Sequence, residues 1–351
     1  MTTVTVKASK TYDVTIGAGL LATAGEALKK IIAPPARVML MTDDTVEALY
    51  AAKLTATLVG AGYTVTTFAF PHGEASKNTS TLVEMWEAMA RAGLTRTDFV
   101  AALGGGVVGD MAGFAAATYL RGIPYVQVPT TLLAAVDSSV GGKTAIDLPA
   151  GKNLCGAFCQ PRLVLCDTDT LTTLPAEVFR DGCAEVIKYA ILYDPDFFDY
   201  LRKSALDFDR EAVIARCVEL KRDVVMADEF DTGARMKLNL GHTIGHGVEA
   251  GSNFALSHGK SVAIGIAIVA RAAAAMGMCT VECSKKIQNL LKDFGLPVDT
   301  EYSPEELFAC ALSDKKRSGS SVRLIIPREI GRCDIVPTPV SELTSFIEAG
   351  L

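Results

Sequence analysis

The chain has 351 residues, of which 49% are hydrophobic and 21% are charged, as is usual for a globular protein. Its net charge of −6 argues against nucleic acid or an anionic membrane surface as a partner. The nine cysteines are odd in number and lack C-x-x-C spacing, which favours buried thiols over disulfides or a cysteine zinc site. The N-terminus has no signal-peptide pattern and the longest apolar run, residues 262–270, is too short to span a bilayer, so we expect a cytoplasmic protein.

Up to about residue 170, short β-branched segments alternate with helical periodicity. Strands are predicted in RVMLMTDD, YTVTTFAF, DFVAALGGG and YVQVPTT, with helices at residues 46–61 and 79–92 and a further helix that ends near residue 119. This alternation predicts a mostly parallel, Rossmann-like sheet covered by helices.

After LVLCDTDTLTTLP the pattern changes to helices, with few strand candidates before SVRLIIP. The predicted helices cover residues 175–193, 197–206, 210–227, 238–250, 260–276 and 283–293. We therefore divide the chain into an α/β domain of residues 1–174 and a mainly α-helical domain of residues 175–351, and expect the active site in the cleft between them.

A glycine motif follows the strand FVAAL. Gly104, Gly106 and Gly109 satisfy G-x-G-x-x-G, and a helix is predicted from about residue 110. This context suits backbone N–H groups that hold a pyrophosphate. The acidic residue expected about 20 residues downstream in a dinucleotide site is missing, although Asp43 ends the first strong strand. The alternative is that the glycines only allow close contact between helix and sheet.

Three of the four histidines, His242, His246 and His258, lie in one short segment. His242 and His246 are one helical turn apart and share a face, although Thr243 rules out the H-E-x-x-H protease motif. Imidazoles with a carboxylate would suit Zn²⁺ with an open catalytic position. The alternative is a set of histidines that serve packing or lie on the surface.

Two further features carry charge. Glu185 and Lys188 lie three residues apart in an apolar helix, as an ion pair or as a metal ligand beside a cation that holds substrate. Basic residues also interrupt glycine-rich or apolar segments, and together they suit a phosphorylated and carboxylated substrate. They are Arg121, Lys143, Lys152 with Asn153, Lys221, Arg235, Lys315 and Lys316.

Six segments, taken together, resemble the 3-dehydroquinate synthases of the sugar phosphate cyclase superfamily. They are PHGEASK, GGGVVGDMAGFAAATYLRGI, VPTTLLAAVDSSVGGKTAID, GKNLCGAF, DGCAEVIKYA and RMKLNLGHTIGHGVE. The resemblance extends from RVMLMTD through SDKKRSG. It implies a homodimeric lyase of the shikimate pathway, which leads to aromatic amino acids, with NAD and a divalent metal, usually Zn²⁺ and alternatively Co²⁺.

The resemblance also assigns residues. The implied NAD contacts are Asp43, Glu74, Lys77, Gly105, Gly106, Val107, Asp110, Thr130, Thr131, Lys152 and Thr173. The implied metal ligands are Glu185, His242 and His258, so that His246 becomes a substrate contact instead of a ligand. The implied substrate contacts are Asp137, Lys143, Asn153, Lys188, Lys221, Arg235, Asn239, His246 and one of Lys315 or Lys316, with Arg121 lent across a dimer interface.

The implied reaction converts 3-deoxy-D-arabino-heptulosonate 7-phosphate into 3-dehydroquinate and phosphate through transient oxidation by NAD. The alternatives are a sister cyclase that makes 2-deoxy-scyllo-inosose or a valiolone, a metal-dependent polyol dehydrogenase, and a non-catalytic NAD-binding protein. Two residues depart from the family pattern: Asp231 replaces a glutamate, and His72 replaces an aspartate, which we expect to alter cofactor affinity.

Overall fold

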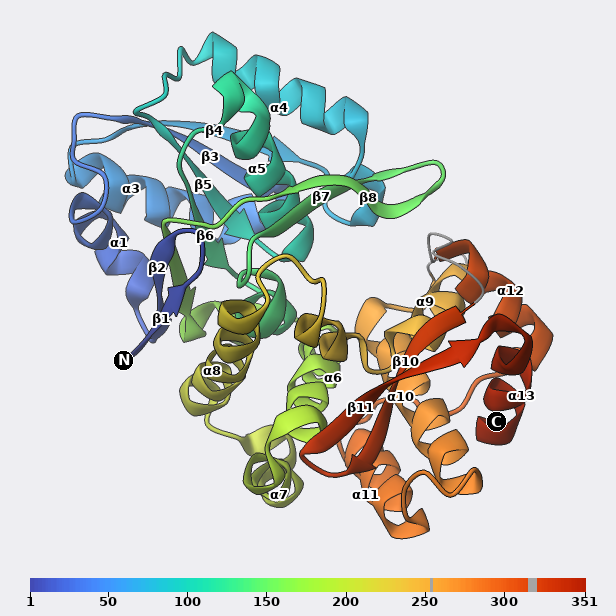
Figure 1. The fold of residues 1–351 in the computed structure, drawn as a ribbon. Coiled ribbons are helices and arrows are strands. Elements are labelled where there is room, and N and C mark those ends of the chain that lie inside the picture. The colour runs from blue at the N-terminus through green and yellow to red at the C-terminus, as the bar shows by residue number, and fades with distance from the viewer. Residues whose placement is uncertain (253–254, 315–320) are drawn as a thin grey trace. The chain divides into compact units, whose positions relative to one another are not determined.

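The computed structural model describes residues 1–252, 255–314 and 321–351, and of the side chains it leaves out 310–314 as well. It consists of two compact units (Figure 1). The first contains Met1–Pro175 and Arg210–Phe230, and the second contains Ala176–Asp209 and Asp231–Leu351. The chain first passes from one unit to the other after Pro175, next to the boundary predicted near residue 174. However, residues 210–230 pack with the first unit and not with the second.

The first unit is built on a sheet with the strand order β1-β2-β9-β6-β5-β3-β4, which comprises seven strands in the described part of the chain. Its strands are β1 (Thr2–Lys7), β2 (Thr11–Gly17), β3 (Arg37–Asp43), β4 (Thr64–Phe70), β5 (Phe99–Gly104), β6 (Tyr125–Pro129) and β9 (Leu163–Asp167). Only the β1–β2 pair at one edge is antiparallel, and the other neighbours in this sheet run parallel. The predicted mostly parallel sheet is confirmed.

Helices cover both faces of the sheet because its central strands are apolar on both sides. Along β3, Val38 and Leu40 join one core with α1 (Leu20–Lys29) and α3 (Ala52–Gly60). Met39 and Met41 alternate with them and join a second core, to which α4 (Thr79–Arg91) and α5 (Gly106–Thr118) also contribute. The short helix α2 (Asp44–Val46) follows β3 directly.

Two hairpins of this unit were not predicted from the sequence. β1 and β2 alternate buried and exposed residues, and β7 (Lys143–Leu148) pairs with β8 (Gly151–Phe158) in a separate two-stranded sheet. Helix α8 (Arg210–Ala227) packs on β1, where Thr2 Oγ1 donates to Glu211 Oε1 at 2.8 Å. The hairpin β1–β2 thus explains why α8 belongs to the first unit.

The second unit is mainly helical, as predicted. Its helices are α6 (Ala176–Tyr193), α7 (Pro195–Ser204), α9 (His242–Gly251), α10 (His258–Ala275), α11 (Val281–Asp293), α12 (Pro304–Asp314) and α13 (Val340–Gly350). An antiparallel hairpin of β10 (Ser321–Glu329) and β11 (Arg332–Pro339) completes it.

One predicted helix begins later than expected. The helix predicted from residue 238 starts at His242, because Ala234–Asn239 form a 3₁₀ turn and Gly241 adopts a left-handed φ of 77°. The apolar run at residues 262–270 lies in α10 and is buried. Among the described residues, no helix is both long and apolar enough to cross a membrane.

Candidate functional site

Three side chains from three helices of the second unit meet at one point. Glu185 lies in the middle of α6, whereas His242 and His258 are the first residues of α9 and α10. The Nε2 atoms of both histidines lie 3.5 Å from Glu185 Oε1. The structure thus brings together the three residues that the resemblance assigned as metal ligands.

The geometry of this cluster fits a tetrahedral metal. Bonds of about 2.0–2.2 Å at tetrahedral angles separate ligand atoms by about 3.4 Å, close to the observed 3.5 Å. Glu185 is 1% exposed, yet neither of its carboxylate oxygens accepts a hydrogen bond of ordinary geometry from a described residue. Lys188 is a cationic partner of Oε2, whereas Oε1, the oxygen that both histidines face, has no hydrogen-bond donor among the described residues and suits a bound cation.

Each histidine also has an oxygen atom near its other ring nitrogen. Nδ1 of His242 lies 3.1 Å from the carbonyl oxygen of Leu240, and Nδ1 of His258 lies 3.7 Å from Glu249 Oε2. Metal-binding histidines usually have such a partner, which selects the tautomer that leaves Nε2 free. Glu249 was not predicted as part of the site, although it continues the face of α9 that carries His242 and His246.

The electrostatics of the cluster favour an added positive charge. Burial, with the nearby charge of Lys188, lowers the pKa of His242 well below its usual value. Burial also acts to lower the pKa of His258, but Glu185 and Glu249 outweigh it and raise this pKa to about 10. Two buried carboxylates thus attract a cation to this position, as in a metal site.

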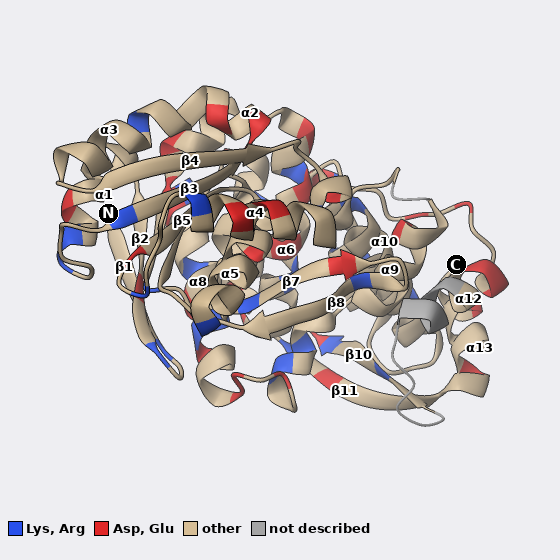
Figure 2. Ribbon diagram, turned by 90° about the horizontal axis from the view of Figure 1, so that it is seen from above, with Lys and Arg blue, Asp and Glu red and all other residues tan. Residues whose placement is uncertain are grey.

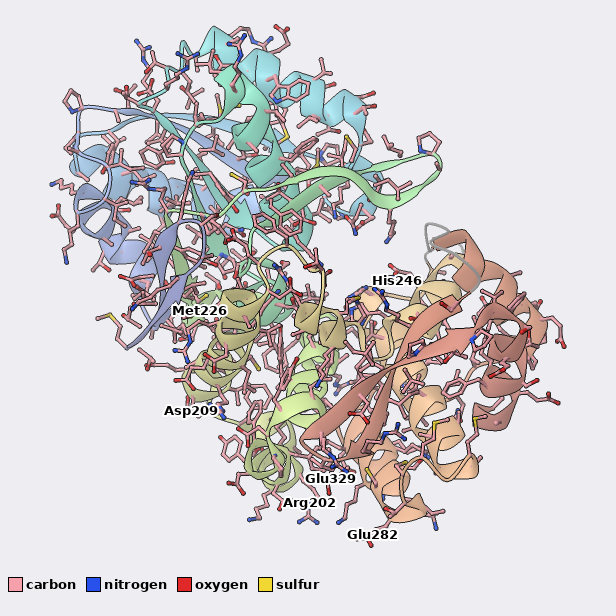
Figure 3. All side chains as sticks on the ribbon, in the orientation of Figure 1. Arg202, Asp209, Met226, His246, Glu282 and Glu329 are labelled. Carbon is pink, nitrogen blue, oxygen red and sulfur yellow. The ribbon has the colours of Figure 1, made fainter. Side chains whose placement is uncertain are left out.

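Two of the predicted substrate residues of this unit, Lys188 and His246, lie beside the cluster. Lys188 forms an ion pair with Glu185 and is 1% exposed. The His246 ring, labelled on α9 in Figure 3, lies 5.4 Å from the His242 ring and 6.0 Å from the His258 ring between centroids. Arg235 is 2% exposed and belongs, with Asn239, to the 3₁₀ turn before α9. The two predicted lysines Lys315 and Lys316 lie outside the described residues.

Glycines allow α9 and α10 to approach closely enough for the two histidines to meet. A Cβ atom on Gly265 would lie 2.1 Å from the carbonyl oxygen of Gly241, and one on Gly245 would lie 2.8 Å from that of Ser261. Side chains at these positions would force the helices apart. Gly245 of α9 and Gly265 of α10 therefore allow the helices that begin with His242 and His258 to pack closely.

The first unit carries a different candidate site at the carboxyl ends of its parallel strands. β3 lies between β4 and β5. The chain therefore places β4 on one side of β3 and then crosses over to place β5 on the other side. Open α/β sheets bind ligands at such a switch point. Asp43 ends β3 and Gly104 ends β5, which places both at this edge.

The turn between β5 and α5 has the properties of a phosphate-binding turn. Gly105 is the N-cap of α5, and no side chain caps the helix there. A Cβ atom on Gly105 would lie 3.1 Å from the methyl group of Thr131, and one on Gly106 would lie 3.2 Å from Ser138 Oγ. Because Gly105 and Gly106 have no side chains, a ligand can approach the protein backbone closely at this turn. The N-terminus of α5 favours an anion there.

Buried hydroxyl groups near this turn support a polar ligand. The hydroxyls of Thr130, Ser138 and Ser139 are buried and have no hydrogen-bond partner among the described residues. The backbone of Thr130 donates to the Gly104 carbonyl at 2.9 Å, which places it beside the glycine turn. Ser138 and Ser139 were not predicted, because a serine after a helical segment carries no distinctive sequence signal.

Lys77 links residues of the predicted cofactor and substrate sets. Its ammonium group donates to Asp110 Oδ2 at 2.7 Å and to Asn153 Oδ1 at 2.6 Å. Burial acts to lower the pKa of Lys77, but Asp110 and Glu74 outweigh it and raise this pKa. Glu74 also pairs with Lys152 at 3.5 Å, so the four predicted cofactor residues form one charged network.

The β7–β8 hairpin presents Asn153 in a constrained conformation. Asn153 is exposed with a left-handed φ of 55°, and its backbone N–H donates to Asp147 Oδ1 at 2.8 Å. The backbone N–H of Asp147 donates in turn to the Lys77 carbonyl at 2.8 Å. Asp147 was not predicted as a site residue, yet it holds the predicted substrate contact in place. Lys143 begins the same hairpin, which carries both basic and acidic residues (Figure 2).

Another predicted pair joins α8 to the helical turn Ala134–Ser138. Lys221 on α8 is 5% exposed, donates to the Asp137 carbonyl at 2.7 Å and forms an ion pair with its carboxylate. Its position in the first unit follows from the packing of α8 there.

The remaining predicted residues lie at varied places. Asp43 caps α2 by accepting from the Val46 N–H at 2.9 Å. Val107 is half-buried in the first turn of α5, and Thr173 bonds through its hydroxyl to Tyr50. His72, the first departure, is exposed and lies 2.8 Å from Asp44 Oδ1. Asp231, the second departure, has a left-handed φ of 59°, a conformation that Asp adopts more readily than Glu.

Solved structures place this architecture among the sugar phosphate cyclases. A 2-deoxy-scyllo-inosose synthase complexed with carbaglucose-6-phosphate, NAD⁺ and Co²⁺ matches with a TM-score of 0.89 at 25% identity, over 100% of both chains. The 2-epi-5-epi-valiolone synthase ValA from Streptomyces hygroscopicus, with NAD⁺ and Zn²⁺ bound, also matches with a TM-score of 0.89, at 28% identity over 99% of this chain and 97% of that chain.

Sequence comparison is more specific. Residues 67–181 match the family described as 3-dehydroquinate synthase N-terminal, and residues 182–317 match 3-dehydroquinate synthase C-terminal. A 3-dehydroquinate synthase from Pelobacter propionicus is 46% identical over 344 residues, which cover 95% of each chain. The chain belongs to the 3-dehydroquinate synthase family.

Proposed function

We propose that this chain converts 3-deoxy-D-arabino-heptulosonate 7-phosphate into 3-dehydroquinate and phosphate, with NAD and a divalent metal, Zn²⁺ or Co²⁺. The observation that carries the proposal is the buried Glu185 carboxylate with both histidine Nε2 atoms at 3.5 Å, in a chain 46% identical to a curated 3-dehydroquinate synthase. When bound, NAD⁺ would accept and return a hydride at C5 of the substrate, and the metal would polarise the C5 oxygen.

The first unit would hold NAD. The uncapped N-terminus of α5 would bind the pyrophosphate through backbone N–H groups at Gly105, Gly106 and Val107. Asp43 and Glu74 would accept hydrogen bonds from ribose hydroxyls. The other proposed cofactor contacts are Lys77, Asp110, Thr130, Thr131, Lys152 and Thr173. The unpartnered hydroxyl of Thr130 supports this assignment.

The basic residues would hold the two anionic ends of the substrate. We assign the phosphate to Lys143, Asn153 and His246, with Lys315 or Lys316 of the undescribed segment. Arg235 and Lys221 would bind the carboxylate, because the planar guanidinium of Arg235 suits a bidentate contact. Asp137, Lys188 and Asn239 would contact the hydroxyl groups. Since the substrate's phosphate can itself serve as a base in its elimination, these residues would mainly hold a reactive conformer.

The homodimer is also a proposal. Arg121 is exposed, has a left-handed φ of 68° and follows Leu120 with a φ of 49°. Such strain in non-glycine residues is common at functional positions. This conformation supports a role for Arg121 in reaching the active site of a partner subunit. The cytoplasmic location stays a prediction of the sequence.

The test combines metal-loaded protein, NAD⁺ and 3-deoxy-D-arabino-heptulosonate 7-phosphate, and follows phosphate release and NADH absorbance together. We expect phosphate far beyond enzyme equivalents, no lasting NADH, and loss of turnover with a chelator. Glucose 6-phosphate, whose carba-analogue is bound in the matching 2-deoxy-scyllo-inosose synthase, and a seven-carbon sugar phosphate without a carboxylate are the controls for the sister cyclases, which match at 25% and 28% identity. Phosphate release from a control sugar alone would assign the chain to a sister cyclase, and stoichiometric NADH from a polyol would assign it to a dehydrogenase.

A further inference from the structure

We propose that Glu249 is a positioning residue of the metal site, whose carboxylate holds the His258 ring with Nε2 directed toward Glu185. The inference rests on the proposed function, because it takes Glu185, His242 and His258 as the metal ligands.

The His258 ring lies between two buried carboxylates. Its Nε2 atom is 3.5 Å from Glu185 Oε1, and its Nδ1 atom is 3.7 Å from Glu249 Oε2. Glu185 is 1% exposed and Glu249 is 5% exposed. At 3.7 Å the second contact is longer than a hydrogen bond, and the Glu249 carboxylate acts on the Nδ1 side of the ring through its charge at a position with little water.

The two histidine ligands differ in what faces Nδ1. His242 has the neutral carbonyl of Leu240 at 3.1 Å, fixed by the backbone before α9. His258 Nδ1 instead faces the side chain of Glu249, so the orientation of the His258 ring depends on one residue that can be replaced by mutation. A carboxylate behind a ligating histidine fixes the ring and increases its basicity, and its loss costs about 10–100-fold in metal affinity in known sites.

Glu249 could also be imagined as a ligand, because His246, Glu249 and His258 offer ligand atoms within 4.8 Å of one another. His258 belongs to both groups, so the two positions compete for it. We favour the group with Glu185, since Glu185 Oε1, which faces the Nε2 atoms of both His242 and His258, accepts no hydrogen bond from a described residue. Glu249 then acts through His258 and not on the metal.

The experiment measures Zn²⁺ affinity by competition with a chelator, and the visible spectrum of the Co²⁺-loaded full-length protein. The test variant is Glu249→Gln, which keeps the shape and removes the charge. His258→Ala reports the loss of a ligand. The matched control is Glu282→Gln, at an exposed glutamate of α11 in the same unit that pairs with Lys286 at 2.8 Å (Figure 3).

We expect Glu249→Gln to bind one Zn²⁺ per chain about 10–100-fold more weakly than the original protein, with a shifted Co²⁺ spectrum. Glu282→Gln should match the original protein in both measurements. Should Glu249→Gln fail to fold, Glu249→Asp replaces it, with a smaller loss in the same direction because its carboxylate reaches less far.

Two results would overturn the inference. Unchanged affinity and spectrum in the folded variant would show that Glu249 has only a structural role. A loss as complete as that of His258→Ala would show that Glu249 is itself a ligand. If the original protein binds no Zn²⁺ or Co²⁺, the metal requirement of the proposed function fails as well, whereas normal binding by the original protein confines the failure to Glu249.

Discussion

At the scale of single residues, the candidate sites combine charge with burial. Glu185, Lys188 and Arg235 are at most 2% exposed, and Lys221 is 5% exposed. A buried charge costs several kcal/mol unless partners compensate it. Ionic residues at such positions are more readily explained by ligand binding than by stability, because well-packed apolar residues would stabilise the fold at least as well.

Arg235→Lys tests the proposed carboxylate contact. Lysine keeps the charge but cannot make two parallel hydrogen bonds, so we expect kcat/KM for the sugar phosphate to fall about 10–100-fold, the equivalent of one charged hydrogen bond. Steady-state kinetics give this ratio, with thermal unfolding and Zn²⁺ affinity as controls of the fold. Unchanged kinetics would remove Arg235 from the substrate site.

Asp147→Ala tests whether the β7–β8 hairpin must hold Asn153. The variant removes the acceptor of the Asn153 N–H, observed at 2.8 Å, and lets a left-handed residue relax. We expect KM for the sugar phosphate to rise several-fold, up to about tenfold, from the loss of about 1 kcal/mol. Asp147→Asn keeps an acceptor oxygen and should remain near the original KM. If both variants are equally impaired, the charge of Asp147 matters and not its hydrogen bond.

The metal site shows what residue spacing can and cannot reveal. Helical spacing pairs His242 with His246, but Nε2 of His258, 16 positions after His242, lies as close to Glu185 as that of His242 does. The contact depends on where a second helix begins, which no periodicity encodes. The resemblance supplied His258, and only the three-dimensional arrangement revealed Glu249, Asp147 and Ser138.

At the scale of elements, the N-terminus of α5 offers a direct test. Gly105→Ala adds a methyl group 3.1 Å from that of Thr131, in the space proposed for the pyrophosphate. We expect NAD⁺ affinity to fall at least about tenfold, or about 1.4 kcal/mol, in a titration by calorimetry. Gly60→Ala is the control, because its Cβ meets nothing within 4 Å. Equal NAD⁺ affinity in the two variants would contradict the phosphate-binding role of this turn.

The contact of α9 with α10 offers a second test. Gly265→Ala places a Cβ atom 2.1 Å from the Gly241 carbonyl, so the helices must separate. We expect about 1–3 kcal/mol of destabilisation in chemical unfolding. Weaker Zn²⁺ binding should accompany it, because His242 and His258 begin these two helices. A destabilised variant with unchanged Zn²⁺ affinity would show that the metal site tolerates this separation.

Most elements with strong local signals were predicted from the sequence. The central strands are continuous apolar runs, and α6, α8, α10 and α11 begin within two residues of their predicted starts. The hairpin β7–β8 is rich in polar residues and glycine, so its strands depend on pairing more than on local propensity. The strands β1 and β2 do carry a local signal, since β-branched and aromatic residues alternate in TTVTVK and TYDVTIG, and that signal was missed.

At the scale of the whole molecule, the chain does not divide at a single point. Helix α8 follows two helices of the second unit, yet Glu211 bonds to Thr2 and Lys221 to Asp137, across 209 and 84 residues of sequence. A pattern of helices and strands gives no information on contacts at such separations. The predicted boundary near residue 174 therefore missed that α8 returns to the first unit.

This division predicts that the two cofactors protect different parts of the chain from hydrogen exchange. A ligand that binds the native state stabilises it by about 2.7 kcal/mol at 100 times its Kd. The proposed NAD⁺ contacts, which include residues of β3, α5 and the segment after β6, all lie in the first unit, whereas Glu185, His242 and His258 lie in the second. We expect NAD⁺ alone to slow exchange in β3, α5 and the segment after β6.

Zn²⁺ alone should slow exchange in α6, α9 and α10, measured by mass spectrometry of peptic fragments. Glu185→Gln should lose the effect of Zn²⁺ and keep that of NAD⁺, because its substitution affects only the metal ligands. Protection by Zn²⁺ within β3 or α5 of that variant would mean that the metal binds elsewhere in the chain.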